Sequence, residues 1–410
     1  MSCSPVNNPS SDNVLIKNYP IEIKESQSTK KLSEKIPQEK ITKTFQSKKI
    51  FTEMEIILPK LTNTRITEHL INSFELSIYI KEKNNTILNI NRYVDLQDLK
   101  SILKIKGKPG TIFIGTLSSD ATKLVKEYCN KGILFFSFAA DKNLADECVY
   151  LINFFPEDDL LALFNYFPTD SKIALLYPEN YYGYNINKII DPIASKSKSL
   201  LINRASYKED LTNARDAIKE LGKFEFRKYE LERQKKILKN KNDEASKNAL
   251  KKIQRFETVG DVDFTHLILP DYSIRLLEIA PLLPFYDVDP NKVQFVGTGV
   301  WDDKVFFDEP ALQGAIFSGI EESKRKDFFN DYEFFYSEKP IRTATIPYDV
   351  VGLISYFIEQ NMTLGDVYNL LDSGNVKFDG IDGKFFFTNN IIFRELDILK
   401  IHKGEAIQLN

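Results

Sequence analysis

The sequence predicts an α/β protein with two lobes, each built from a parallel sheet that helices cover on both faces. Short apolar runs alternate with stretches of helical periodicity over most of the 410 residues, and this alternation is typical of parallel sheets. The residues after position 50 are numerous enough for two such sheets. The clearest expected strands are 54–59, 87–90, 111–115, 133–138, 172–178, 265–270 and 293–297.

Helical signals fill the intervals between these strands. Residues 67–81 repeat apolar side chains on helical faces. Ser118 and Ser119 form a turn and N-cap signal ahead of a helix expected at 121–131, which Gly132 is well suited to end. Binding clefts in open α/β sheets lie at the carboxyl ends of the strands, so a site is expected where these strands end.

The first 50 residues predict a disordered tether. Asn, Ser, Lys, Glu and Pro dominate residues 1–50, which carry too little apolar surface to offset the entropy of ordering. Cys3, followed by a polar tail, is typical of a mature bacterial lipoprotein directly after its cleavage site. Cys3 is therefore a predicted lipidation site, and an incidental cysteine in a disordered tail is the alternative.

Composition and motifs exclude several functional classes. A net charge of -3 and a sequence pI of about 5.9 argue against nucleic acid as a partner, because phosphate contacts need a basic surface. No run of about 20 apolar residues exists, so membrane association is expected only through a lipid anchor. The three histidines lack metal-ligand spacing, and neither a P-loop nor a G-x-S-x-G motif occurs. We therefore predict no metal, no cofactor and no catalytic residue.

The cysteines Cys129 and Cys148 leave two states open. They could form a disulfide in an oxidising compartment, or they could remain separate thiols. Both lie within expected regular elements, and their relative geometry does not follow from the sequence.

Residues 223–256 interrupt the alternation of strands and helices. They are dense in Lys, Arg and Glu, and no Gly or Pro occurs between Lys223 and Val259, which predicts a long helix of about 50 Å. Asn242 and Asp243 could cap a second helix and so fold the segment into a hairpin. The segment is either a solvated helical excursion or an arm that binds a partner.

Several motifs resemble the penicillin-binding protein activator family. The most specific ones lie at 269–276, 280–283, 289–290, 297–303 and 309–314, and the fourth reads Gly-Thr-Gly-Val-Trp-Asp-Asp. This series is similar to the alphaproteobacterial branch of the family, and the resemblance extends over residues 51–410. It implies a type I periplasmic-binding-protein fold, in which two three-layer αβα lobes are joined by three crossovers.

The resemblance also implies a function. It points to a non-catalytic lipoprotein that binds a peptidoglycan synthase, a penicillin-binding protein, and regulates it by direct contact. The expected location is the periplasm, with a lipid anchor at the outer membrane of a Gram-negative bacterium. The alternative is a periplasmic solute receptor that delivers an amino acid or similar small ligand to an ABC transporter. An enzyme is not expected: Asp302 and Asp303 are adjacent, so they point in different directions and more simply cap a turn.

The implied fold divides the chain at three crossovers. Lobe 1 is expected to hold residues 51–155 and 319–371. Lobe 2 is expected to hold residues 156–318 and 372–410, with the charged excursion at 223–256.

Seven residues at expected strand ends are candidates for the ligand cleft. Type I binding proteins hold amino-acid-like ligands with hydroxyl groups, with backbone N–H groups at helix starts and with an acid for the ammonium group. Helix N-termini favour anions because their free backbone N–H groups carry partial positive charge. The candidates are Ser118, Ser119, Ala139, Ala140, Tyr182, Asp271 and Trp301. For the serines N-capping alone is the alternative, Asp271 could be a turn residue, and Trp301 could pack across a loop.

Overall fold

The computed structural model describes residues 45–409, except 51–52, 62–63, 82–86, 273 and 375. Cys3 and most of the predicted tether lie outside the described residues. Residues 45–50 were expected in the tether but pack on the folded chain instead. Lys49 forms a β-bridge with Thr363, and Ile50 is buried among apolar side chains. The tether was therefore predicted to extend too far at residues 45–50, where Phe45 and Ile50 supply apolar surface to the core of unit 1.

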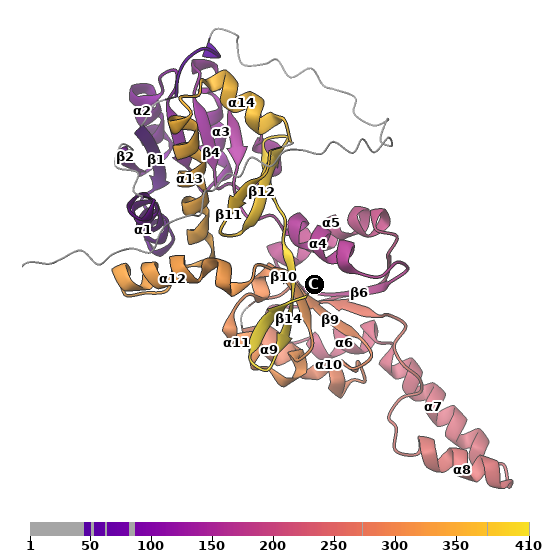
Figure 1. Ribbon diagram of the computed structural model, residues 1–410. Coiled ribbons are helices and arrows are strands. Elements are labelled where there is room, and N and C mark those ends of the chain that lie inside the picture. Colours follow the sequence, from indigo (N-terminus) through magenta and orange to yellow (C-terminus); the bar gives the residue numbers. More distant parts are fainter. Residues whose placement is uncertain are drawn as a thin grey trace, which may run out of the picture. The chain divides into compact units, whose positions relative to one another are not determined.

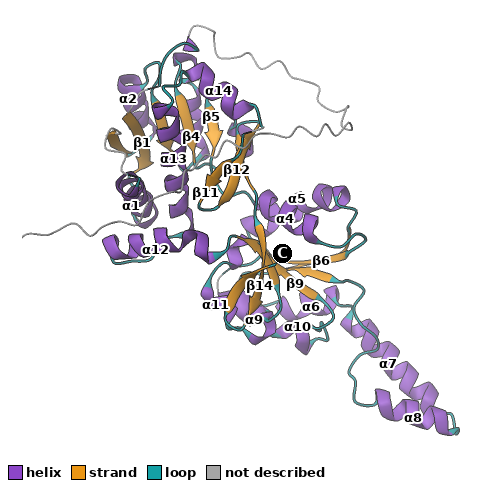
Figure 2. Ribbon diagram, viewed as in Figure 1, coloured by secondary structure: helices purple, strands orange, loops and turns teal. Residues whose placement is uncertain are grey.

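The described chain divides into two compact units. Unit 1 holds the residues up to Phe155 and Ser323–Glu395, and unit 2 holds Pro156–Glu322 and Leu396–Asn410. Each unit contains one sheet with flanking helices (Figure 2), and the chain passes between the units three times. The first two crossovers lie beside the predicted positions.

The sheet of unit 1 is parallel at its centre and antiparallel at one edge (Figure 1). Its strand order is β11-β12-β13-β5-β4-β3-β1-β2, and the pairs from β13 to β2 are parallel. Every residue of β3 and β4 is buried, as expected for strands that are covered on both faces. The strands are β1 (Glu53–Pro59), β2 (Ile87–Tyr93), β3 (Ile112–Gly115), β4 (Leu134–Ser137), β5 (Val149–Leu151), β11 (Phe378–Gly380), β12 (Gly383–Thr388) and β13 (Ile391–Arg394). The helices are α1 (Arg65–Ile80), α2 (Leu96–Lys106), α3 (Ser119–Lys126), α12 (Glu322–Tyr336, which begins at the unit boundary), α13 (Thr345–Glu359) and α14 (Leu364–Asp372).

Unit 2 has three layers, because helices pack on both faces of its sheet. Ala174 and Leu176 of β6 pack into a cluster with α6, whereas Ile173 and Leu175 pack into a second cluster with α4 and α5. Alternate residues of one strand thus face two cores. The strand order is β15-β14-β10-β9-β8-β6-β7, with β14 and β15 antiparallel. The strands are β6 (Lys172–Pro178), β7 (Leu200–Tyr207), β8 (His266–Ile268), β9 (Gln294–Gly297), β10 (Ile316–Gly319), β14 (Asp397–His402) and β15 (Glu405–Gln408). The helices are α4 (Pro156–Tyr166), α5 (Tyr181–Lys196), α6 (Ala214–Leu221), α7 (Phe224–Lys239), α8 (Glu244–Ile253), α9 (Ile274–Ile279), α10 (Leu282–Phe285) and α11 (Lys304–Phe307).

The third crossover corrects the predicted boundary. Residues 372–395 were expected in lobe 2, but β11, β12 and β13 extend the sheet of unit 1 and only Leu396–Asn410 returns to unit 2. Ile391 pairs with Leu151 of β5, and Phe387 is buried in the core of unit 1. A local apolar pattern cannot identify which of two sheets such strands join.

The cysteines and the charged excursion have definite structures. Cys129 and Cys148 form a disulfide that links the segment after α3 to the residue before β5. Helices α7 and α8 form the hairpin that the capping signal predicted, since the Asp243 side chain accepts a hydrogen bond from the Ser246 backbone N–H. Among the described residues, no helix is both long enough and apolar enough to cross a membrane.

Candidate functional site

A cluster of hydroxyl groups lies where β3 and β4 end in unit 1. The hydroxyl of Thr122 lies 2.7 Å from that of Thr116 and 2.9 Å from that of Ser137, and the last two are 3.2 Å apart. All three side chains are fully buried. Thr116 also has a φ of 49°, a conformation that is sterically costly for a β-branched residue. The strand end thus combines backbone strain with polar groups at the start of α3.

The four candidates of unit 1 lie around this cluster. The Ser118 hydroxyl accepts a hydrogen bond from the Ala121 backbone N–H, so Ser118 is the N-cap of α3, as the simpler interpretation predicted. Ser119 is half-buried in the first turn, and Ala140 is exposed. Ala139 is fully buried and donates its backbone N–H to the Ser137 hydroxyl. Ser118 and Ser119 therefore remain candidates for contact with a ligand, whereas the side chain of Ala139 is enclosed.

In unit 2, Tyr182 joins a polar network at the end of β9. Its hydroxyl lies 2.8 Å from the hydroxyl of Thr298, and burial followed by the charge of Asp159 raises the pKa of Tyr182 well above its ordinary value. The Asp159 carboxylate accepts hydrogen bonds from the Gly299 backbone N–H at 3.0 Å and the Ser318 hydroxyl at 2.8 Å. This network connects α4, α5, β9 and β10. Its members other than Tyr182 carried no individual signal in the sequence.

Asp271 is the acid that was predicted to face a ligand cation, but the structure pairs it internally. It is fully buried after β8, and both carboxylate oxygens have partners within unit 2. Arg275 donates at 3.2 and 3.0 Å, the Tyr207 hydroxyl donates at 2.6 Å, and the Tyr272 backbone N–H donates at 2.7 Å. The hydrogen bond to Asp271 raises the pKa of Arg275, and burial followed by the Asp271 charge raises that of Tyr207.

Trp301 is a core residue and does not line an open surface. Its side chain is fully buried, and its indole N–H donates to the Leu269 carbonyl at 3.1 Å. The ring lies so close to Gly297 that a Cβ atom there would be 2.0 Å from it, which explains the glycine in this motif. Asp303 caps α11 by accepting a hydrogen bond from the Val305 backbone N–H, in agreement with the turn role.

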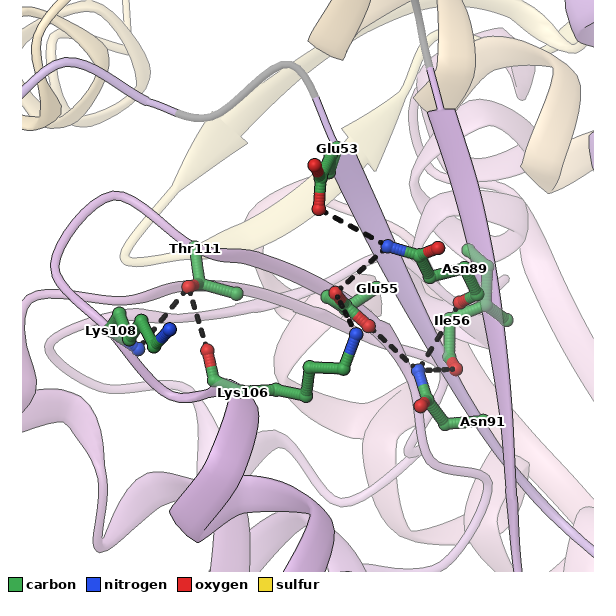
Figure 3. A network of polar contacts seen from close by, with 8 residues as sticks. All are labelled: Glu53, Glu55, Ile56, Asn89, Asn91, Lys106, Lys108 and Thr111. Atoms are coloured by element: carbon green, nitrogen blue, oxygen red, sulfur yellow. Dashed lines mark hydrogen bonds and ion pairs between the residues drawn. The ribbon is translucent and has the colours of Figure 1, made fainter.

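A cavity of about 280 Å³ lies in unit 1 beside the start of β3 (Figure 3), away from the strand ends. Its floor carries the buried Glu55 carboxylate, which accepts hydrogen bonds from the side chains of Asn89, Asn91 and Lys106 at 2.8–3.0 Å. Figure 3 shows these three groups directed at Glu55. Lys106 is 51 residues from Glu55, so no local pattern predicts the pair. The carboxylate is already balanced, and no cluster of His, Cys, Asp or Glu among the described residues could hold a metal ion.

Comparison with known proteins gives matches only at the level of structure. No protein-family model and no curated sequence matches the chain. A protein from Rhodospirillum rubrum assigned to branched-chain amino acid ABC transport matches with a TM-score of 0.66 at 13% identity, over 87% of this chain and 99% of that one. The C-domain of LpoA (YraM) from Haemophilus influenzae, a regulator of PBP1A, matches with a TM-score of 0.59 at 12% identity, over 87% and 100%.

The chain has the type I periplasmic-binding-protein fold. The predicted fold class is therefore confirmed, with mixed sheets in place of purely parallel ones. A further match, an ABC transporter substrate-binding protein from Desulfitobacterium hafniense in complex with Leu, has a TM-score of 0.54 at 14% identity and covers 87% of this chain and 100% of that one. Proteins of ABC transporters and a regulator of PBP1A thus share this fold, so the fold alone does not distinguish between these two functions.

Proposed function

We propose that this chain is a non-catalytic envelope protein that binds a peptidoglycan synthase of the penicillin-binding protein class and regulates it by contact. The observation that carries the proposal is the internal pairing of Asp271. A receptor for amino acids needs an acid for the ligand ammonium group, and this strand end holds its acid in a buried pair with Arg275. Releasing Asp271 to a ligand would break its hydrogen bonds with Arg275, the Tyr207 hydroxyl and the Tyr272 backbone N–H, which is costly at a fully buried carboxylate.

Two further observations support the proposal. The sequence motifs resemble the penicillin-binding protein activator family, and the structure is similar to the C-domain of LpoA. The Cys129–Cys148 disulfide fits an oxidising compartment such as the periplasm. Lipidation at Cys3 would hold such a protein at the outer membrane.

A pull-down from envelope extracts tests the proposal. The chain is immobilised as bait, with the leucine-binding Desulfitobacterium hafniense protein as a control bait of the same fold. We expect a bifunctional penicillin-binding protein in the eluate of this chain and not in that of the control. Failure to recover a synthase, combined with amino-acid binding at millimolar concentration or better, would overturn the proposal.

The lipid anchor needs a separate measurement. Mass spectrometry of the protein extracted from native membranes should find Cys3 acylated. An unmodified Cys3 in those membranes would refute the anchor without affecting the proposed partner.

The second candidate function is a solute receptor. The strained Thr116 and the hydroxyl groups of Ser118 and Ser119 at the start of α3 favour it, because hydroxyls and a helix N-terminus suit a ligand carboxylate. A thermal-shift screen against amino acids and cell-wall fragments tests this function, since a ligand that binds only the folded chain raises its melting temperature. A shift that Ser119→Ala abolishes, while Ser101→Ala on exposed α2 leaves it intact, would favour the receptor.

A further inference from the structure

The α7–α8 hairpin is strongly basic within an acidic chain. Residues 223–256 contain 12 Lys or Arg and 5 Asp or Glu, a net charge of +7, so the remainder of the chain carries -10. The two helices pack against each other, and Figure 1 shows them extending away from the sheet of unit 2. A concentrated charge of this kind, opposite in sign to the rest of the protein, makes a local positive field.

The base of the hairpin is firmly held. Arg227 is buried near the start of α7, and its guanidinium donates to four backbone carbonyls. These carbonyls belong to Gly222, Gly260, Tyr286 and Asp287, at 2.9–3.5 Å. Because they come from both ends of the hairpin and from the loop after α10, the arm is anchored to unit 2 and can present a defined surface.

Most of the positive charge on the arm is not used internally. Four of the five acids have partners: Glu225 pairs with Lys219, Glu230 with Arg233 and Glu232 with Lys235, and Asp243 caps α8. Within the part of the chain that the structure describes, seven exposed lysines of the arm form no ion pair. These are Lys228, Lys236, Lys239, Lys241, Lys247, Lys251 and Lys252. Their charge is therefore available to an external anionic partner.

An exposed apolar stripe accompanies this charge. Phe226, Tyr229 and Ile237 are 65%, 66% and 49% exposed. Their spacing on α7 places them on one face, opposite the face of Arg227 and Leu231, which are buried. Large apolar side chains beside lysines are the composition of helices that lie in a membrane interface.

We propose that the hairpin binds the surface of a bilayer that contains anionic lipids. Lysines supply nine of its 12 cations, and lysine acts as a flexible point charge suited to a diffuse anionic surface. A specific acidic protein site would favour arginine forks, but two of the three arginines are occupied, Arg227 by carbonyls and Arg233 by Glu230. The apolar stripe on α7 would enter the interface while the lysines contact headgroups.

Vesicle flotation with the unacylated 410-residue chain tests the proposal. The vesicles are phosphatidylcholine alone, or phosphatidylcholine and phosphatidylglycerol in equal parts. We expect binding only to the second kind and a loss of binding as salt concentration rises, because salt screens exposed charges. Equal binding to both kinds, or no binding to the anionic vesicles at low salt, would overturn the proposal.

Two variant pairs localise the binding. Changing Lys236, Lys239, Lys251 and Lys252 to Gln should weaken binding about tenfold or more, because each basic residue near an anionic surface contributes. The control changes four exposed lysines elsewhere to Gln, namely Lys100, Lys104, Lys188 and Lys196. Phe226→Ser with Tyr229→Ser should weaken binding several-fold, whereas Phe334→Ser with Tyr181→Ser, both 80% exposed, should not.

The outcomes separate a membrane from a protein partner. If either hairpin variant bound vesicles like its control, the hairpin would not be the membrane-binding element. If the chain ignored vesicles but the lysine variant lost the synthase in the pull-down, the arm would serve a protein partner and the bilayer proposal would be wrong. Circular dichroism of each variant verifies that the helices are retained.

Discussion

Two buried aspartates, one in each unit, are stabilised in different ways. In unit 2, Asp271 has a dedicated arginine, a tyrosine hydroxyl and a backbone N–H on its two oxygens. In unit 1, Asp349 accepts a hydrogen bond from the Ile381 backbone N–H on one oxygen, and the charge that acts on it most strongly is that of another acid, Asp382. Burial, and then the charge of Asp382, raise the pKa of Asp349 to about 7. The charge of Asp349 therefore changes near neutral pH.

The setting of Asp382 explains part of this difference. Arg342 forms an ion pair with Asp382 at 2.8 Å and lies 4.0 Å from the centre of the Phe154 ring. Arg394 lies 4.4 Å from that ring and donates to the carbonyls of Ile152 and Asn153. Burial opposes the charge of Asp382, but Arg342 and the other arginines outweigh it and lower its pKa. The arginines therefore favour Asp382 as the ionised member, next to the chain segments that leave unit 1 at Phe155 and Glu395.

The largest loss of stability is expected from a change at Asp382. Asp382→Asn removes a fully buried carboxylate whose charge acts on Arg342, Arg325 and Arg394, and it should lower the free energy of unfolding by about 3–5 kcal/mol. Urea unfolding at pH 7 measures the change. Asp379→Asn, in the same β11–β12 hairpin but half-buried, is the matched control and should cost about 0.5 kcal/mol or less.

Asp271→Asn should have a smaller effect. Arg275 retains Glu209 at 3.4 Å when Asp271 is neutral, whereas Arg342, Arg325 and Arg394 all lose the charge of Asp382 in the other variant. We expect a loss of about 2 kcal/mol in the free energy of unfolding. Glu209→Gln removes only the exposed partner and should cost less than about 0.5 kcal/mol. A loss for Asp271→Asn greater than that for Asp382→Asn would contradict the comparison.

The raised pKa of Asp349 predicts an unusual pH dependence of the free energy of unfolding. Its pKa is about 7 in the folded chain against 3.8 for an ordinary aspartate, so between these values the folded state binds the extra proton. Its contribution to stability is therefore complete below about pH 4 and is lost as the pH rises through about 7. The Asp349→Asn variant should lack this pH dependence of stability. At pH 8 its free energy of unfolding should exceed that of the wild type by about 1–2 kcal/mol. Parallel pH profiles for the two proteins between pH 5 and pH 8 would show that Asp349 does not titrate in this range.

The smallest effect concerns the tyrosine on Asp271. Tyr207→Phe removes a buried 2.6 Å hydrogen bond but leaves Arg275 and the Tyr272 N–H on the carboxylate, so about 1 kcal/mol should be lost. Tyr184→Phe, on a side chain that is 53% exposed, is the control and should be near neutral. Thermal unfolding of the two variants at the same pH distinguishes their losses of stability.

The sequence could predict the features that local patterns encode. Buried strands such as β3 and β4 appeared as apolar runs, Ser118 was identified as a cap, and Asp243 predicted the turn of the hairpin. Each of these features depends on residues only a few positions apart in the chain, so a local sequence pattern is sufficient to predict it.

Long-range partners could not be predicted in this way. Tyr207 and Asp271 are 64 residues apart, and β13 pairs with a strand more than 200 residues earlier, so neither contact leaves a local signal. Asp271 was correctly placed after a strand, but its role depended on Arg275 turning back towards it. Trp301 was placed in the right loop, yet its burial depends on the space above Gly297.

The most direct measurement is the rate of peptidoglycan cross-linking by a purified bifunctional penicillin-binding protein while this chain is titrated in. We expect the rate to rise several-fold and to saturate at a one-to-one ratio, since the proposed chain acts by stoichiometric contact and does not turn over. A rate that stays constant up to a large excess of the chain would contradict the proposed function.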